Sequence, residues 1–171
     1  MIDSHCHLDH EPLFADLDNV IIRAKDIGVK KFLTICTNKK SYENIITFID
    51  KYPEVYGTFG IHPHDAENEL LTKNEIIEKV KINKKFIGVG ESGLDFYYNN
   101  SQRDLQINSF INHIEASIEL KKPIIIHSRS AEKETFDILN DFKNYKPKIL
   151  MHCFTGSLDF AHDLIKLNAY F

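Results

Sequence analysis

The stretch PIIIHSRSAEKETFDILNDFKNYKPKILMHC, residues 123–153, contains two apolar runs, each with a histidine at or next to its C-terminal end. The runs 123–127 and 148–153 are short, aliphatic and bounded by polar residues, which is typical of buried strands. The segment between them, after Ser130, has the character of a short helix. Two strands joined through a helix predict parallel pairing with a crossover connection, so this stretch indicates an α/β fold.

The same alternation of strand and helix patterns extends over the rest of the chain. Further strands are expected at Ile2–His5, Lys31–Cys36, Val55–Ile61 and Phe86–Glu91, and Ala169–Phe171 could begin a seventh. Apolar residues recur at helical spacing between these strands, and Thr72 with Glu75 has the spacing of a capping box. No Pro/Gly-rich linker or charge block divides the chain, so a single domain over residues 1–171 is predicted.

Two architectures satisfy this pattern, an open doubly wound sheet and a TIM-like (β/α)8 barrel. The periodicity of the strands and helices does not separate them. Ligand-type side chains gathered from the C-terminal ends of several strands are typical of the barrel. Because such residues close four of the expected strands, we predict a TIM-like barrel of which about six βα units are present and the last strands are missing.

The composition excludes several classes of protein. Apolar runs are only a few residues long, whereas a membrane-spanning helix needs about 20, so no membrane span is expected. The N-terminus lacks the pattern of a secretory signal. An odd count of 3 cysteines without close pairing argues against a disulfide framework, so we expect a reducing cytoplasm. With a formal net charge of −4, a nucleic acid would have to be held by local cations or by bound metal.

Five ligand-type side chains stand at the ends of expected strands. His5 and His7 close the first strand, and their spacing of two residues turns both side chains to one side. Glu91, His127 and His152 close the fourth, fifth and sixth strands. Imidazoles with one carboxylate suit zinc, manganese or a similar divalent ion. Because a carboxylate can bridge, Glu91 could join a His5/His7 ion to a His127/His152 ion, with the two ions roughly 3.5–4 Å apart.

Three further residues could address a substrate. The segment Gly60-Ile61-His62-Pro63-His64 closes the third strand, and its two histidines could contact a phosphate or a leaving group, or be solvated loop residues. Arg129 lies two residues past His127 and could grip a phosphate or form a surface ion pair. The remaining histidines, His10, His113 and His162, are interpreted as structural or exposed, and Cys6 and Cys153 as buried small side chains.

Residues 88–93 match the dinucleotide fingerprint G-x-G-x-x-G, but we reject a dinucleotide site. The residues that follow, Leu94 to Asn100, lack the periodicity of a helix that begins on the last glycine. A phosphate cradle also works through backbone N–H groups at a helix N-terminus, where Glu91 would repel a pyrophosphate. The glycines are expected instead to give the strand end room beside the metal ligands.

The order of these motifs resembles that of the TatD-type deoxyribonucleases, within the wider group of metal-dependent hydrolase barrels. Asp3-Ser4-His5-Cys6-His7 is similar to the opening D-[ST]-H-x-H of that family. The other motifs follow in the family's order: Gly60-Ile61-His62-Pro63-His64, Gly88-x-Gly90-Glu91-x-Gly93-Leu94-Asp95, Pro123-x-x-x-His127-x-Arg129 and His152-Cys153-Phe154-Thr155-Gly156. The resemblance runs from residue 1 to the end of the chain.

The resemblance implies a cytoplasmic TIM-like barrel that hydrolyses DNA phosphodiester bonds with two divalent ions, Mg²⁺, Mn²⁺ or Zn²⁺. It assigns His5 and His7 to one metal, Glu91 to both as a bridge, and His127 and His152 to the second. The other expected roles are catalysis by Glu91 and His62, and substrate contacts by His62, His64 and Arg129.

Members of that family are about half as long again, in keeping with the ~250 residues that such barrels typically need. Their final metal ligand is an aspartate at the end of the eighth strand, and no aspartate after His152 fits, since Asp159 and Asp163 fall in a helical stretch. We therefore expect a fragment or a truncated form with impaired activity. An open sheet would also leave edges at the first and sixth strands, which favours self-association.

Two other functions stay open on the sequence. A barrel of the same kind could hydrolyse an ester or amide, such as an aminoacyl-tRNA, because the same metals serve those reactions. The second alternative is an inactive metal-binding remnant that persists through partners or oligomerisation. A nuclease should degrade DNA with a divalent ion, whereas bound metal without turnover would indicate the remnant.

Overall fold

Six parallel strands form one curved sheet in the computed structural model, which describes all of residues 1–171. The strands pair in sequence order, each parallel to its neighbours. They are β1 (Ile2–Cys6), β2 (Lys31–Thr34), β3 (Val55–Phe59), β4 (Phe86–Asp95), β5 (Ile124–Arg129) and β6 (Ile149–Met151). Because each strand is followed by a helix, the chain is a half-barrel of consecutive βα units, which confirms the predicted TIM-like architecture.

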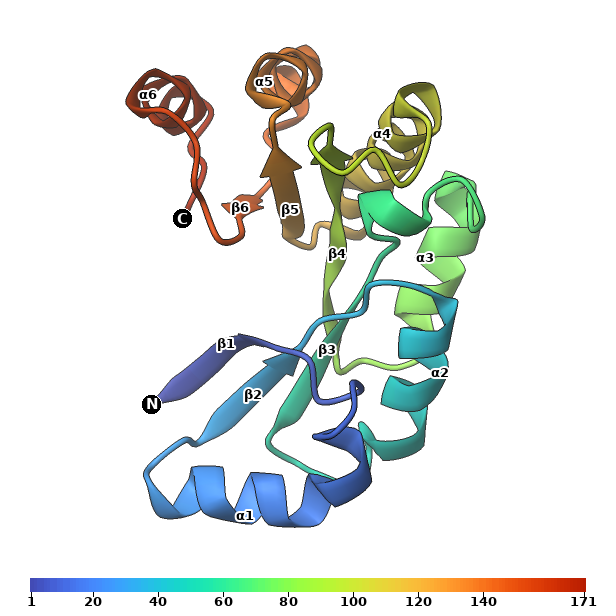
Figure 1. Cartoon of the computed structure of the whole chain (residues 1–171), viewed down its shortest axis with the longest axis vertical. Helices are drawn as coiled ribbons and strands as arrows, with labels where there is room; N and C mark the ends of the chain where they lie inside the picture. Colours follow the sequence, from blue (N-terminus) through green and yellow to red (C-terminus); the bar gives the residue numbers. More distant parts are fainter.

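The helices lie around the outside of the sheet, and both termini lie on the side that no helix covers (Figure 1). They are α1 (Leu17–Asp26), α2 (Lys39–Phe48), α3 (Lys73–Lys81), α4 (Arg103–Leu120), α5 (Glu132–Asp141) and α6 (Leu158–Lys166). The capping box predicted at Thr72 and Glu75 is confirmed at the start of α3. None of the helices has the length and apolar character needed to cross a membrane.

Two hydrophobic clusters hold the helices against the sheet. The larger has 21 buried residues and joins β1–β4 to α1–α3, through side chains such as Phe32, Ile45 and Ile76. The smaller has 12 and joins the end of β4, β5 and β6 to α4–α6. The long strand β4 contributes to both, with Val89 in the first cluster and Leu94 in the second. Burial of this apolar surface is the main term that stabilises the half-barrel.

The fourth strand is longer than the sequence pattern predicts. We expected it to end at Glu91, and this is wrong, because β4 continues to Asp95 and pairs with β5 up to Arg129. Residues 92–95 lack the alternation of a strand, and Gly93 has a positive φ of 144°, so only the pairing with β5 keeps them extended. The expected seventh strand is reduced to a single parallel bridge between Leu150 and Tyr170.

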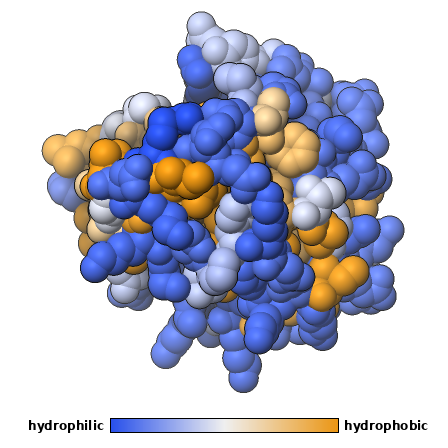
Figure 2. All heavy atoms as spheres, turned by 90° about the horizontal axis from the view of Figure 1, so that it is seen from below, coloured by the Kyte–Doolittle hydropathy of each residue, from blue (hydrophilic) through white to orange (hydrophobic).

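The sheet edges and its uncovered face carry exposed apolar side chains. In the strand order β1 and β6 are the two ends: β1 has an open outer edge, whereas the outer edge of β6 is paired only with Tyr170. Ile2 of β1 is 64% exposed, Ile87 of β4 is 40% exposed, and Tyr170 beside β6 is 72% exposed. Viewed from below, apolar patches interrupt an otherwise hydrophilic surface (Figure 2). Such edges and patches favour association with other chains.

Candidate metal centre

The C-terminal ends of the strands meet at a pocket of about 520 Å³. None of its lining side chains is apolar, and six of them are imidazoles. The lining residues are His7, His10, Thr37, Asn38, His62, His64, Asp65, Glu91, His127 and His152. This is the end of a parallel βα sheet at which barrel enzymes place their active sites.

Glu91 lies at the centre of this arrangement. The residue is only 3% exposed, because it lies on β4 in the middle of the sheet. One carboxylate oxygen is 3.5 Å from His5 Nε2, and the other is 3.3 Å from His127 Nδ1 and 3.9 Å from His62 Nε2. A single buried carboxylate is thus shared by imidazoles from β1, β5 and the segment after β3.

Two of the three groups of possible ligand atoms have Glu91 in common. His5, Glu91 and His152 form one of these, and His62, Glu91 and His127 form the other, each with ligand atoms within 4.8 Å of one another. His7, Asp9 and His10 form the third group, whose ligand atoms are equally close. The His5 and His152 rings are stacked, with centroids 3.4 Å apart. This grouping differs from the one implied by the family resemblance, which pairs His5 with His7 and His127 with His152.

His7 stands beside the first group. Its ring centroid is 5.3 Å from that of His5, and its Nδ1 is 3.1 Å from the carbonyl oxygen of Ile35. A hydrogen bond from Nδ1 to a carbonyl leaves Nε2 as the nitrogen that can bind a metal ion, which is the usual arrangement of metal-binding imidazoles. All five predicted metal ligands are therefore brought to one end of the sheet.

The protonation states in the pocket suit a metal centre. Burial alone would raise the pKa of Glu91, but the contacts with His127 and His5 and the charges of His62 and His152 outweigh it and hold that pKa well below its usual range. Burial also lowers the pKa values of His7 and His152, and it lowers that of His62 to about 4. At neutral pH Glu91 is thus an ionised carboxylate and His7, His62 and His152 are uncharged imidazoles, which are the forms that bind metal.

A buried nitrogen without a hydrogen-bond partner also indicates that a cation can bind here. His5 Nε2 is buried and has no hydrogen-bond partner in the protein. Its distance of 3.5 Å to the Glu91 carboxylate is longer than an ordinary hydrogen bond. An unpartnered buried polar atom costs free energy, so this nitrogen is better explained as a ligand atom than as packing. Nitrogen and carboxylate donors together fit zinc or manganese.

Comparison with known proteins identifies the family. The family model described as TatD related DNase matches residues 2–171. The chain belongs to the TatD family. An uncharacterized metal-dependent hydrolase of Buchnera aphidicola from Acyrthosiphon pisum is 37% identical, over 99% of this chain and 68% of its own length. The 3'-5' ssDNA/RNA exonuclease TatD of Shigella flexneri is 29% identical, over 92% of this chain and 60% of its own length.

Solved structures agree with the TatD assignment. The Escherichia coli TatD homolog YjjV superposes with a TM-score of 0.86 at 25% sequence identity, covering 99% of this chain and 66% of that one. A TatD-family hydrolase of Entamoeba histolytica has a TM-score of 0.85 at 19% identity, covering 99% of this chain and 63% of that one. The chain therefore spans about two thirds of the length of the TatD-family proteins that it matches.

In this TatD-family chain the predicted substrate contacts lie on one side of the pocket. His62 and His64 follow β3, and the second packs edge-to-face against the first with centroids 4.4 Å apart. Arg129 ends β5 and is exposed at the rim, outside the pocket lining. Its guanidinium lies over the rings of Tyr97 and Tyr98. The structure thus brings the two histidines into the pocket and leaves the arginine beside it.

Asp95 is a functional candidate that the sequence interpretation missed. It is fully buried, and its Oδ2 lies 2.9 Å from His64 Nε2 and 3.1 Å from His127 Nε2. Burial raises the pKa of Asp95, but the Tyr98 N–H and these two imidazoles outweigh it and lower that pKa. The same contacts, with Glu91, raise the pKa of His127 against the effect of burial. Asp95 lies four residues after Glu91, which puts both carboxylates on one side of β4, but residues 92–95 lack the alternation that would have predicted a strand there.

The glycines of the rejected dinucleotide pattern make room for the site. A Cβ on Gly90 would lie 2.5 Å from the carbonyl oxygen of Ile125, and a Cβ on Gly93 would lie 2.0 Å from the carbonyl oxygen of His127. Only glycine allows the strands that carry Glu91 and His127 to approach this closely. No helix begins at these glycines, since α4 starts at Arg103, which agrees with the rejection of a dinucleotide site.

Three residues outside the predicted set differ at least in part from expectation: His10, Cys153 and Cys6. His10 is exposed as expected, yet it lines the pocket and lies 3.2 Å from a carboxylate oxygen of the buried Asp9. Cys153 is exposed rather than buried, because β6 ends at Met151 and the alternation assumed for a longer strand does not reach it. Cys6 is half-buried, and burial, with Asp3 and Asp9, raises the pKa of its thiol to about 12.

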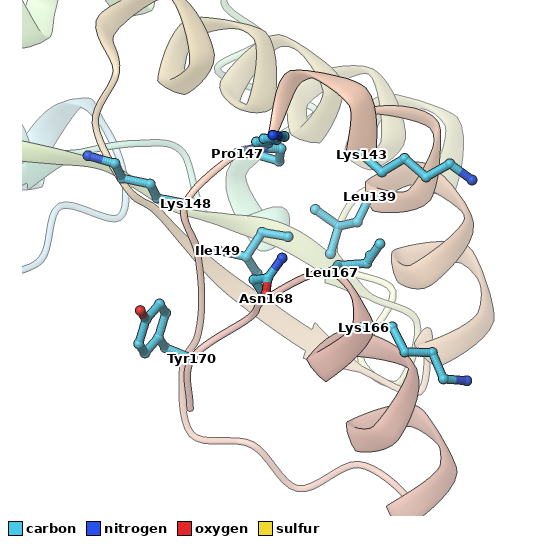
Figure 3. A pocket seen from close by; sticks show the side chains of 10 residues that line it. Leu139, Lys143, Pro147, Lys148, Ile149, Lys166, Leu167, Asn168 and Tyr170 are labelled. Carbon is cyan, nitrogen blue, oxygen red and sulfur yellow. The ribbon is translucent and has the colours of Figure 1, made fainter.

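A second cavity lies at the opposite, N-terminal end of the strands. Its volume is about 450 Å³, and residues from the start of β6, the end of α5 and the segment after α6 line it. Lys148 extends away from Lys143 and Lys166, so the ammonium groups of these three lysines do not converge on one point (Figure 3). The lining contains no carboxylate, histidine or cysteine, and the cavity therefore lacks the usual ligands of a metal ion.

Proposed function

We propose that the protein is a divalent-metal-dependent deoxyribonuclease that hydrolyses phosphodiester bonds of DNA. The observation that carries the proposal is the buried Glu91 carboxylate, shared by two imidazole groups at the base of an open polar pocket. Two ions held there would polarise a phosphodiester and supply a hydroxide nucleophile. The relative named as an ssDNA/RNA exonuclease supports a nucleic acid as substrate.

The residues that would hold the ions come from four strands. His5, His7, Glu91, His127 and His152 are the proposed ligands of two ions, Mg²⁺, Mn²⁺ or Zn²⁺. Asp95 would orient the His127 ring by accepting from one of its nitrogens, which is the common outer partner of a metal-binding imidazole. Glu91 serves as the shared ligand because its low pKa keeps it ionised.

His62 would act on the substrate as a neutral donor. With a pKa of about 4, its ring is uncharged at neutral pH. Its Nδ1 accepts a hydrogen bond from the His64 N–H, so the single ring proton is on Nε2, which faces the pocket. That N–H can donate to a phosphate oxygen without bringing a further positive charge toward the ions. His64 and Arg129 are proposed as further substrate contacts on the same side.

The state of the cysteines supports a reducing compartment. Cys6, Cys36 and Cys153 are all free thiols. Burial raises the pKa of the Cys36 thiol to about 12, so it is inert as a nucleophile. We propose that the protein acts in the cytoplasm, where thiols persist.

The test is hydrolysis of single-stranded DNA by the purified chain after chelation and re-addition of Mg²⁺, Mn²⁺ or Zn²⁺. We expect cleavage that depends on the ion and falls by at least roughly 100-fold in Glu91→Gln and His127→Asn, about 2.7 kcal/mol of transition-state stabilisation. His162→Ala removes an exposed histidine of α6 and should leave both cleavage and metal content unchanged.

Metal content and an ester substrate complete the experiment. Elemental analysis should show about two ions per chain in the wild type and fewer in the two ligand variants. Cleavage of p-nitrophenyl acetate without any cleavage of DNA would show that the protein is an esterase and would refute the nuclease proposal. Stoichiometric metal without turnover of either substrate would identify an inactive metal-binding remnant.

A further inference from the structure

Two exposed tyrosines and one arginine form a cluster beside the metal centre. Tyr97 and Tyr98 directly follow Phe96 after β4 and are 60% and 52% exposed. Arg129 ends β5, and its guanidinium carbon lies 4.3 Å from the Tyr97 ring centroid and 4.7 Å from that of Tyr98. The two tyrosine rings are nearly perpendicular, at 89°. Tyr97, Tyr98 and Arg129 together are here named the aromatic rim.

The aromatic rim is held by a buried carboxylate. Asp95 Oδ1 accepts hydrogen bonds from the backbone N–H groups of Tyr97 at 3.0 Å and of Tyr98 at 2.9 Å. Arg129 also donates to the Tyr98 hydroxyl at 3.4 Å. Asp95 is fully buried and bound to Gln106 of α4, so the backbone that presents these tyrosines is anchored in the core. Exposed aromatic side chains on an anchored backbone lose little conformational entropy when a ligand binds.

The aromatic rim continues directly into the pocket. The Tyr98 ring packs edge-to-face on His64 with centroids 5.5 Å apart, and His64 packs in the same way on His62 at 4.4 Å. The second oxygen of Asp95 holds His64 and His127. One carboxylate therefore fixes both the wall of the metal pocket and the aromatic surface next to it.

The chemistry of the aromatic rim suits a planar ring better than a phosphate. The Arg129 guanidinium lies over two aromatic rings and donates to a hydroxyl, whereas a phosphate fork needs its donors turned to the ligand. Tyrosine faces and a guanidinium plane are the surfaces on which nucleobases stack in single-stranded nucleic acid complexes. Bases of an intact duplex are already stacked on each other and would not reach it.

We propose that the aromatic rim is a stacking platform for a nucleobase of single-stranded nucleic acid, adjacent to the phosphodiester in the pocket. The inference rests on the proposed nuclease function, because it places the base next to the bond that would be cleaved. It narrows the substrate to single strands or frayed ends. It also assigns Arg129 to a base rather than to a phosphate.

Binding without turnover tests the platform. The affinity of the full chain is measured in chelator by fluorescence anisotropy, with a labelled oligothymidylate and an abasic oligonucleotide of the same length and charge. We expect tighter binding of the oligothymidylate, and a loss of between about 5-fold and 150-fold in Tyr97→Ala and Tyr98→Ala, the range for one stacked base. Binding of the abasic oligonucleotide should not change in these variants.

Three variants separate stacking from a structural role. Tyr97→Phe and Tyr98→Phe keep the rings and should keep the preference for bases. Tyr145→Ala removes a tyrosine that is 67% exposed in the short 3-10 helix after α5 and should have no effect on either affinity. Each variant's thermal melt is compared with that of the wild type to confirm that the chain is folded.

The two proposals fail in distinguishable ways. Equal affinity for the oligothymidylate and the abasic oligonucleotide would overturn the platform, even if DNA is cleaved in Mn²⁺. Base-dependent binding that is lost in the alanine variants would uphold the platform, even if no metal supports cleavage and the nuclease activity is refuted.

Discussion

His113 links the stability of this fold to pH through one buried hydrogen bond. The side chain lies on α4, is fully buried, and donates from Nδ1 to the carbonyl of Ser109 at 2.7 Å. Its Nε2 accepts from the backbone N–H of Ile61 at 3.1 Å, directly before His62. A second ring proton would point at that N–H, so the folded state requires neutral histidine.

The size of this effect follows from the two pKa values. Burial lowers the pKa of His113 from 6.5 to about 4 in the folded chain. Below pH 6.5 the unfolded chain takes up a proton that the folded chain does not, so stability is present above that pH and is lost as the pH falls toward 4. Between these values the slope from this group alone approaches about 1.4 kcal/mol per pH unit, and the total loss is roughly 3 kcal/mol.

Urea unfolding of the wild type and His113→Gln across this pH range measures the effect. Glutamine can still accept from Ile61 but cannot be protonated, so the variant should be less stable at neutral pH and lose less stability on acidification. The difference between the two slopes isolates His113, because all other titrating groups are shared. Parallel pH profiles for the two proteins would refute the reasoning.

Three further predictions concern the site and the sheet edge. Gly93→Ala should lower the free energy of unfolding by about 3 kcal/mol or more, because φ is 144° and the new Cβ would collide with a carbonyl oxygen. Gly28→Ala, with φ 96° and open space around it, should lower it by only roughly 1 kcal/mol, and thermal melts of both variants measure the difference. Asp95→Asn should weaken Mn²⁺ binding about 10–100-fold by calorimetry, and unchanged affinity would exclude its orienting role. Sedimentation should show concentration-dependent association that Ile2→Lys on the β1 edge reduces; a monomer at all concentrations would contradict this.

The parts of the fold that depend on local pattern were predictable. Each strand and helix follows from apolar spacing within its own segment, and the five proposed metal ligands were found because each closes an apolar run. Their meeting at one end of the sheet follows from parallel pairing alone, as with His127 and His152 on neighbouring strands. The capping box at Thr72 and Glu75 is equally local and is confirmed.

The parts of the fold and the site that depend on tertiary contacts could not be predicted from the sequence. The stretch of β4 from Gly90 to Asp95 has two glycines with positive φ, Gly90 and Gly93, and only pairing with β5 makes it a strand. The missed carboxylate at Asp95 lies on that stretch. The stacking of His152 on His5 joins the first strand to the sixth, so it depends on the curvature of the whole sheet. No pattern within one segment contains that information.

The apolar interior is divided into two clusters, and the proposed metal ligands come from the strands of both. His5 lies on β1 and His62 follows β3, strands of the larger cluster, whereas His127 lies on β5 and His152 follows β6, strands of the smaller one. Glu91 lies on β4, which contributes to both clusters. An ion bound by ligands from both halves would couple its affinity to the bend of the sheet, because these ligands meet only at that bend. Flattening of the sheet would then separate the ligands and release the ion.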